Sequence, residues 1–281
     1  MQIKIKTPAK INLTLEILGK RTDGFHEIKS IMQMINLYDY LTFDIQENTK
    51  TEINLSGNTD KIPYNEKNIV FKAIQAFIKA ANIGPHKYNV YIEKNIPTEA
   101  GLAGGSSNAV GTLLVFNQYF NNILNSDELS KICATLGSDL NVILMGGCVL
   151  AEGRGELVKK LPFVEYPVSL IKPNLGISAK EGYKKYSELK IKPNKNYTEK
   201  VIELLKLKKD IRKYICNDLE EGVYNFYTEL QNIKHANPNS IMTGSGSTYF
   251  VLENKINRVE DYWFAENLKT IPNGCEIVNL Y

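Results

Sequence analysis

The feature that most constrains this chain is a glycine- and serine-rich segment between an expected strand and an expected helix. Residues 97–109 read PTEAGLAGGSSNA. Its three glycines let a ligand approach the backbone, because glycine has no Cβ. Free N–H groups at a helix start favour an anion, and the hydroxyls of Ser106 and Ser107 can reach a phosphate or Mg²⁺. The segment predicts a phosphate site, although a flexible turn with a serine cap would also account for it.

Two common phosphate-binding loops do not match the segment. A Walker A loop would end in Gly-Lys-Ser or Gly-Lys-Thr, and no such tripeptide follows Gly105. The pattern also differs from the glycine loop of protein kinases. Any phosphate site here therefore belongs to another class of nucleotide-binding protein.

Size and charge limit the other possibilities. The 281 residues are enough for one large domain or two modest ones. The formal net charge of +3 does not favour nucleic acid or a membrane surface. No run approaches the roughly 20 apolar residues of a membrane span, and the alternating start, MQIKIKT, is not that of a signal peptide. We expect a cytoplasmic protein that is a monomer or a weak homodimer.

The four cysteines do not suggest a metal site. Cys133, Cys148, Cys216 and Cys275 are far apart and form no C-x-x-C pair. We therefore expect buried or incidental thiols rather than zinc ligands or a disulfide framework.

Hydrophobic periodicity indicates a mixture of strands and helices in the first half. Apolar residues alternate over 3–17, 41–45 and 90–92, as in half-buried strands. Those of 69–78 fall on one helical face. We expect further helices from near Ser107 to Phe120 and from near Ser126, where Asp127 and Glu128 suit a first turn.

The second half has a similar mixture. We expect strands at 167–171 and 249–252, a lysine-rich exposed helical region at 197–213, and a Gly/Ser loop at 243–248. Glycines and a proline punctuate the chain near 155–165. The predicted architecture is α+β with two domains, 1–157 and 158–281, and a site in the cleft between them.

Seven segments, in this order, resemble the GHMP kinases, the family of galactokinase, homoserine kinase and mevalonate kinase. The glycine segment resembles their second motif, P-x-x-x-G-L-x-[SG]-S-[SA]. The segments are PAKINL at 8–13, KRTDGFH at 20–26, residues 97–107, GSD at 137–139, AEGRG at 151–155, NDLE at 217–220 and MTGSGS at 242–247. The resemblance implies the two-domain GHMP kinase fold, ATP as phosphate donor and Mg²⁺.

The resemblance also assigns roles to residues. The ATP-binding residues would be Pro97, Gly101, Leu102, Ala103, Gly104, Gly105, Ser106 and Ser107, with Lys94 and Asn68 near the adenine. Ser107 is the expected Mg²⁺ ligand.

The family places a lysine and an aspartate beside the acceptor hydroxyl, and Lys10 and Asp139 hold these positions. A carboxylate can accept the hydroxyl proton, and an ammonium keeps that carboxylate ionised and stabilises developing charge. Considered alone, Lys10 would be a strand-surface lysine and Asp139 a helix-end cap.

One segment points to the acceptor. In GHMP kinases that act on cytidine-diphosphate-linked methylerythritol, the segment matching Arg21–His26 holds the cytosine. By this resemblance Phe25 stacks on the base, His26 hydrogen-bonds its edge, Tyr183 closes the other face and Asn12 also binds substrate. The expected reaction is phosphorylation of the 2-hydroxyl of that compound, in the non-mevalonate isoprenoid pathway. Without the resemblance, His26 would be a packed turn residue.

Two departures and two alternatives accompany this interpretation. Relatives commonly have Tyr at Phe25 and continue the aspartate motif as V-P-F-F, whereas here Asn141 replaces the proline.

A sister kinase for another small alcohol would have no need of the cytosine segment. A non-catalytic GHMP-fold regulator would be expected to lose Lys10 or Asp139, and both are present.

Overall fold

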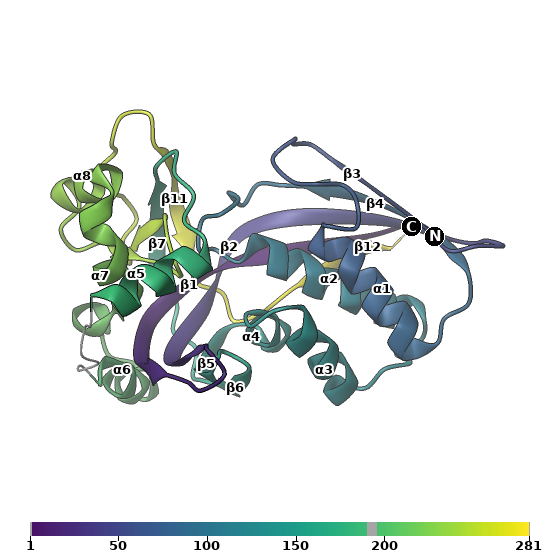
Figure 1. The fold of residues 1–281 in the computed structure, drawn as a ribbon, viewed down its shortest axis with the longest axis horizontal. Coiled ribbons are helices and arrows are strands. Elements are labelled where there is room, and N and C mark those ends of the chain that lie inside the picture. Colours follow the sequence, from purple (N-terminus) through teal and green to yellow (C-terminus); the bar gives the residue numbers. More distant parts are fainter. Residues whose placement is uncertain (1, 190–195, 281) are drawn as a thin grey trace.

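The computed structural model describes residues 2–189 and 196–280, which form two β-sheets with helices packed on them (Figure 1). The strands are β1 Gln2–Lys20, β2 His26–Glu47, β3 Glu52–Gly57, β4 His86–Glu93, β5 Cys148–Gly153, β6 Leu157–Lys160, β7 Pro167–Lys172, β8 Cys216–Asn217, β9 Ile241–Met242, β10 Tyr249–Val251, β11 Trp263–Lys269 and β12 Glu276–Leu280. The helices are α1 Ile69–Ala81, α2 Gly104–Tyr119, α3 Ser126–Leu136, α4 Leu140–Met145, α5 Ala179–Glu188, α6 Tyr197–Lys206, α7 Asp218–Val223 and α8 Thr228–Ala236, with short 3₁₀ turns η1 Arg212–Tyr214 and η2 Tyr224–Phe226.

The long antiparallel pair of β1 and β2 runs through the whole molecule (Figure 1). Near its start β1 alternates between buried and part-exposed residues, as its sequence predicts. From Thr7 to Ile17 every residue is buried, so the expectation of a half-buried strand is wrong there. The reason is that β1 contributes side chains to all three hydrophobic cores and is covered on both faces.

The first sheet supports the glycine segment. Its order is β12-β1-β2-β4-β3, with β5 pairing β2, β6 pairing β5 and β8 pairing β1. Helices α1, α2 and α3 cover one face of this sheet (Figure 1). The core beneath them includes an aromatic cluster in which Phe116 of α2 packs edge-on against Phe43 and Phe77. This packing fixes α2, and with it the helix start that faces the cavity.

The second sheet lies on the opposite side of the cavity from the glycine segment. It has the order β11-β7-β10-β9, and α5, α7 and α8 lie beside it (Figure 1). Tyr249 of β10 and Leu219 of α7 share a core with Leu15 and Ile17 of β1. The far end of β1 therefore joins the second sheet to the first.

The end of the described chain returns to the first sheet. Strand β12 pairs antiparallel with β1, from Ile3 opposite Leu280 to Lys6 opposite Glu276. The division into domains 1–157 and 158–281 stays a prediction, and this strand crosses it. Among the described helices, none has the length and apolar character that a membrane crossing requires.

Most of the expected elements are confirmed, with shifts at their ends. Helix α1 begins after the N-cap Asn68, and α3 begins after Asn125, which forms a capping box with Glu128. Helix α2 begins at Gly104, three residues before the expected start. The helix expected over 197–213 ends at Lys206, because Lys208 adopts a left-handed conformation with φ of 53°.

The strand expected over 41–45 is much longer. Strand β2 already begins at His26, and its first half pairs with β1 on one side and β5 on the other. That half is buried on both faces over most of its length, so it lacks the alternation that marks a half-buried strand.

Candidate active site

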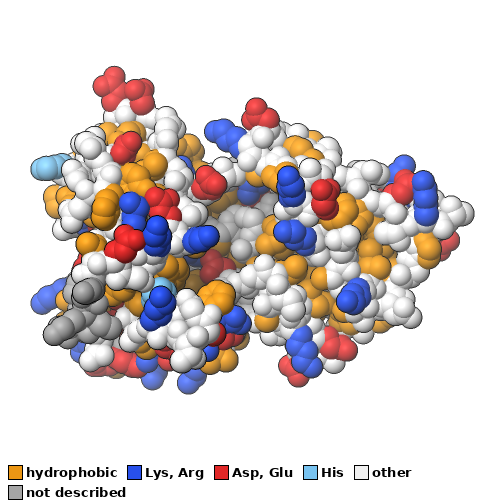
Figure 2. Space-filling model, in the orientation of Figure 1, with side chains coloured by type: hydrophobic (Ala, Val, Ile, Leu, Met, Phe, Trp, Pro, Cys, Tyr) orange, Lys and Arg blue, Asp and Glu red, His pale blue; other side chains and the backbone are white. Residues whose placement is uncertain are grey.

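One cavity of about 1090 Å³ contains most of the residues singled out in the sequence. Its lining comes from β1, the glycine segment, the turn before β2, the residues before α4, and α5. Figure 2 shows the molecule hollowed between its two halves, with Lys and Arg side chains around the hollow. Segments far apart in the sequence therefore meet around a single space.

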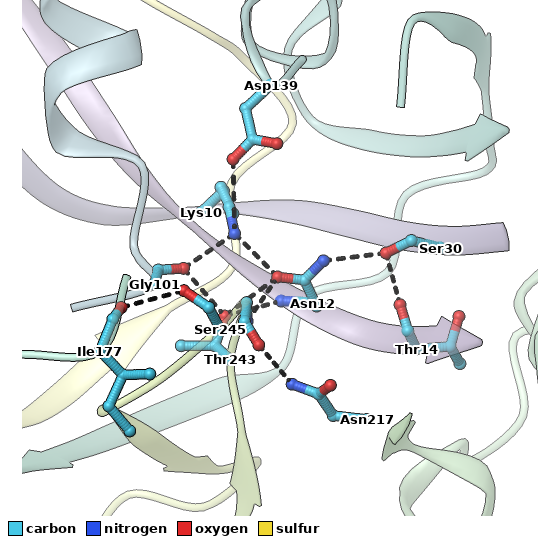
Figure 3. A network of polar contacts seen from close by, with 11 residues as sticks. Lys10, Asn12, Thr14, Ser30, Gly101, Asp139, Ile177, Asn217, Thr243 and Ser245 are labelled. Carbon is cyan, nitrogen blue, oxygen red and sulfur yellow. Dashed lines mark hydrogen bonds and ion pairs between the residues drawn. The ribbon is translucent and has the colours of Figure 1, made fainter. Parts of the chain in front are cut away.

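Lys10 lines this space and is only 3% exposed. Its Nζ donates to Asn12 Oδ1 at 2.8 Å and to the Gly101 carbonyl at 2.8 Å, and lies 3.7 Å from Asp139 Oδ2 (Figure 3). Burial lowers the pKa of Lys10, and the carboxylate of Asp139 partly opposes that shift. The alternative of a strand-surface lysine is wrong, because this side chain is buried and bonded on several sides.

Asp139 immediately precedes α4 but does not cap it. Its side chain makes no hydrogen bond to the backbone of that helix, so the capping alternative is wrong. The side chain is 31% exposed and lines the cavity beside Lys10. It is thus an accessible carboxylate next to a buried cation.

The departure at position 141 has a local explanation. Asn141 is buried, and its Oδ1 accepts from Ser130 Oγ of α3 at 3.1 Å. This contact ties α4 to α3, and the Asp139 backbone belongs to the first turn of α4, since its carbonyl accepts from Ile143 N at 3.1 Å.

A buried polar network fixes the loop 243–248 against Lys10 (Figure 3). Asn12 Oδ1 accepts from Gly244 N at 2.9 Å, and Asn12 N donates to Thr243 Oγ1 at 3.0 Å. Asn217 Nδ2 donates to the carbonyls of Met242 and Gly244 at 2.7 and 2.8 Å. Asn12 was expected to bind substrate, and that stays a prediction. The geometry shows its amide holding Lys10 and the loop together.

Two glycines of the segment are demanded by the protein's own packing. Gly101 has φ of +71°, and a Cβ there would lie 2.0 Å from the Thr243 carbonyl oxygen. A Cβ at Gly104 would lie 2.9 Å from both Ile96 Cγ2 and Lys94 Nζ. A valine at 104 is therefore expected to perturb the fold as well as ligand approach.

The remaining residues of the segment divide between the cavity and the interior. The cavity is lined by Pro97, Ala103, Gly105 and Ser106. Leu102 is buried, and its carbonyl accepts a hydrogen bond from Lys10 N at 3.0 Å.

Ser107 does not reach the cavity. It is fully buried, and its Oγ lies 3.8 Å from Cys275 Sγ. Its role as a metal ligand stays a prediction, and the geometry favours Ser106 for that role.

Lys94 lines the cavity next to Gly104, and its ammonium group forms an ion pair with the carboxylate of Asp39. Asp39 is fully buried, and its Oδ1 also accepts from Asn95 N and Ile96 N, both at 2.8 Å. Burial raises the pKa of Asp39, and the charge of Lys94 opposes this shift. The carboxylate therefore anchors the strand end that leads into the glycine segment.

Asn68 also lines the cavity, but its side chain serves α1. Its Oδ1 accepts from Val70 N at 2.9 Å, and its Nδ2 donates to the Pro63 carbonyl at 2.6 Å. The adenine contacts expected for Lys94 and Asn68 stay predictions.

Aromatic side chains form the far wall of the cavity. Phe25 is 52% exposed, and the guanidinium of Arg154 lies 5.0 Å from its ring centre. The rings of His26 and Tyr183 stack at 5.0 Å and 19°. Burial raises the pKa of Tyr183, and the nearby charge of Asp139 raises it further. His26 and Tyr183 therefore contact each other, and Phe25, which also lines the cavity, contacts Arg154 instead. The binding of a cytosine between Phe25 and Tyr183 stays a prediction.

Positive charge predominates around the cavity. Besides Lys10, six cationic residues line it, namely Lys20, Lys67, Lys94, Arg154, Lys180 and Lys184. Three acidic residues line it, namely Glu99, Asp139 and Glu188. This balance suits a polyanionic ligand such as a diphosphate or triphosphate.

The part of the chain that the structure describes holds no group of three His, Cys, Asp or Glu side chains placed to bind a metal. Mg²⁺ in nucleotide enzymes takes most of its ligands from phosphates and water, with one or two from the protein. The hydroxyl of Ser106, which lines the cavity, fits that limited demand.

Sequence reasoning missed Asp39, although a signal was present. Leu41, Phe43 and Ile45 mark the buried face of β2, and position 39 has the same parity. A carboxylate on that face needs a buried partner. Arg154 and Asn217 lie in two of the seven segments that resemble the GHMP kinases, and the resemblance assigned them no role.

Known proteins resemble the chain over most of its length. A family model described as "GHMP kinases N terminal domain" matches residues 68–147. The 4-diphosphocytidyl-2-C-methyl-D-erythritol kinase of Prochlorococcus marinus (strain MIT 9301) is 40% identical over 89% of this chain and 86% of its own. That of Caldanaerobacter subterraneus subsp. tengcongensis is 36% identical over 99% of this chain and 100% of its own. A crystal structure of 4-(cytidine 5'-diphospho)-2C-methyl-D-erythritol kinase superposes with a TM-score of 0.73 at 27% identity, covering 89% of each chain.

Proposed function

The chain belongs to the GHMP kinases, in the family of 4-diphosphocytidyl-2-C-methyl-D-erythritol kinases, and we propose that it transfers the γ-phosphoryl group of ATP to the 2-hydroxyl of 4-diphosphocytidyl-2-C-methyl-D-erythritol. The observation that carries the proposal is the position of the Lys10–Asp139 pair, which shares one cavity with the start of α2 and the aromatic wall. A phosphate donor bound at the start of α2 and a cytosine bound at the aromatic wall would place the hydroxyl of the substrate beside Lys10 and Asp139.

The chemistry of the pair follows from its geometry. Asp139 is exposed enough to accept a hydroxyl proton as phosphoryl transfer proceeds. Lys10 is held by Asn12 Oδ1 and the Gly101 carbonyl, so its charge stays fixed beside the reacting oxygen. A preorganised cation of this kind stabilises negative charge without reorganisation during the reaction.

The start of α2 is the proposed phosphate site. Free N–H groups and the helix dipole attract anions there, and Gly105 and Ser106 of its first turn line the cavity. Bound Mg²⁺ would neutralise phosphate charge, and Ser106 is the side chain that would hold it. The cytoplasmic location and the monomer or weak homodimer stay predictions.

An ADP-release assay tests the proposal. The full chain is given ATP, Mg²⁺ and one of four alcohols, which are 4-diphosphocytidyl-2-C-methyl-D-erythritol, homoserine, mevalonate and galactose. We expect the cytidine compound to give the highest kcat/KM. Faster phosphorylation of another alcohol would indicate a sister kinase, and calorimetric binding of the cytidine compound without turnover would indicate a regulator.

A further inference from the structure

A chain of hydrogen bonds links two residues of the aromatic wall, His26 and Tyr183, through Ser187. His26, at the start of β2, places its Nε2 2.9 Å from Ser187 Oγ of α5. The same hydroxyl donates to the carbonyl of Tyr183, one helical turn earlier, at 2.9 Å. All three residues line the cavity or form its rim.

The two contacts of Ser187 restrict the proton on His26. A serine hydroxyl has a single proton to donate. When that proton goes to the Tyr183 carbonyl, Ser187 Oγ has only lone pairs to offer His26. The contact at 2.9 Å is then satisfied when Nε2 carries the ring proton.

The neutral ring has only one N–H, so its other nitrogen becomes an acceptor. Burial lowers the pKa of His26, and the charge of Lys20 lowers it further, which favours the neutral ring. Within residues 2–189 and 196–280, Nδ1 has no hydrogen-bond partner. His26 thus offers the cavity one unused acceptor.

We propose that Ser187 is a positioning residue that holds His26 in the Nε2–H tautomer, so that Nδ1 accepts a hydrogen bond from the exocyclic amine of a cytosine. The inference rests on the proposed function for its substrate. Cytosine presents an amine donor at the position where uracil presents a carbonyl acceptor. A uracil would direct its carbonyl oxygen at the lone pair of Nδ1, and the two acceptors would repel.

The tautomer itself can be measured without any substrate. Two-bond ¹H–¹⁵N correlation spectra of the full chain distinguish the two ring nitrogens, and His26→Gln identifies the His26 signals among the three histidines. We expect Nε2 to be protonated in the wild type and the two tautomers to mix in Ser187→Ala. An Nδ1–H tautomer in the wild type, or an unchanged tautomer in Ser187→Ala, would overturn the inference.

Kinetics test the consequence for specificity. We expect the kcat/KM preference for the cytidine compound over its uridine analogue to fall about tenfold in Ser187→Ala, the effect of about one lost polar contact. Ser187→Thr keeps the hydroxyl and should keep the preference. Ser178→Ala removes the N-cap of the same helix without touching His26, and it should also keep the preference.

The outcomes separate this inference from the proposed function. If the wild type does not phosphorylate the cytidine compound, the proposed function fails, whatever the tautomer. If it does so and Ser187→Ala retains the full preference, the role of Ser187 is refuted while the function stands. An equal loss in Ser178→Ala would also refute it, because the effect would then come from the stability of α5.

Discussion

The two sides of the cavity are built differently. The nucleotide side, which we define as Lys10 and residues 94–106, is held by buried contacts to the backbone, such as those of Lys10 with Gly101 and of Asp39 with residues 95 and 96. The base side, which we define as residues 24–26, Arg154 and α5, is held by contacts between partly exposed side chains.

The difference teaches which property each side must supply. Phosphoryl transfer needs atoms placed within a fraction of an ångström, and buried backbone contacts give that rigidity. Base recognition needs only a binding preference, which stacking and one or two hydrogen bonds can provide. Changes on the nucleotide side should therefore affect rate and stability, and changes on the base side should affect substrate KM.

The largest effect is expected from Asp139→Asn, which changes the ion-pair partner of Lys10 on the nucleotide side. The amide cannot accept the proton, so kcat should fall by about 10²- to 10⁴-fold while both ligands still bind. The charge of Asp139 raises the pKa of Lys10, so the variant should also lower that pKa and move any alkaline limb of the rate profile to lower pH. Steady-state kinetics and calorimetry provide the two readouts.

Lys10→Ala and the double variant complete this test. If the pair acts as one unit, the double variant should be little worse than the worse single variant. Multiplying losses would show independent roles, and a kcat of Asp139→Asn within about threefold of wild type would remove Asp139 from the mechanism.

A large loss of stability is expected from Gly101→Ala. The new Cβ would lie 2.0 Å from a backbone oxygen at a positive φ, and we expect a loss of about 2–5 kcal/mol in the free energy of unfolding. Gly105→Ala is the matched control, because its Cβ would meet only Ile69 Cγ2 at 3.7 Å. Urea unfolding curves that show equal stability for the two variants would contradict the inference that the nucleotide side is rigid.

A smaller and more selective effect is expected from Phe25→Ala. Losing one stacking face should raise the KM for the cytidine compound about tenfold to a hundredfold. The KM for ATP and the melting temperature should hardly change, because the ring is half exposed. Equal increases in both KM values would instead assign Phe25 to the fold.

The smallest effect is expected from Arg154→Met, which keeps an unbranched apolar stem and removes the guanidinium cation near Phe25. The KM for the cytidine compound should rise about two- to fivefold. Arg154→Lys retains a cation and should lie between the wild type and Arg154→Met. An increase as large as that of Phe25→Ala would mean that Arg154 contacts the substrate directly.

The sequence predicted the parts of this site better than their connections. Local patterns identified α1, α3 and the glycine segment, because helix periodicity and glycine content act over short distances. The aromatic residues were assigned by the family resemblance. The contact of Gly101 with Thr243 and that of His26 with Ser187 join residues more than 140 positions apart. No local pattern carries such pairings, so the reasons for Gly101 and the role of Ser187 became visible only in the fold.

The pairing of β12 with β1 constrains how this molecule can be made. Ile3 and Lys6 find their partners at Leu280 and Glu276, at the opposite end of the chain. During synthesis the first sheet will have an open edge until strand β12 has left the ribosome, and an unpaired edge invites pairing with other chains. Such distant pairings also slow folding, because a long loop must close before they form. Production at lower temperature, or with chaperones that shield strand edges, should therefore raise the yield of folded protein.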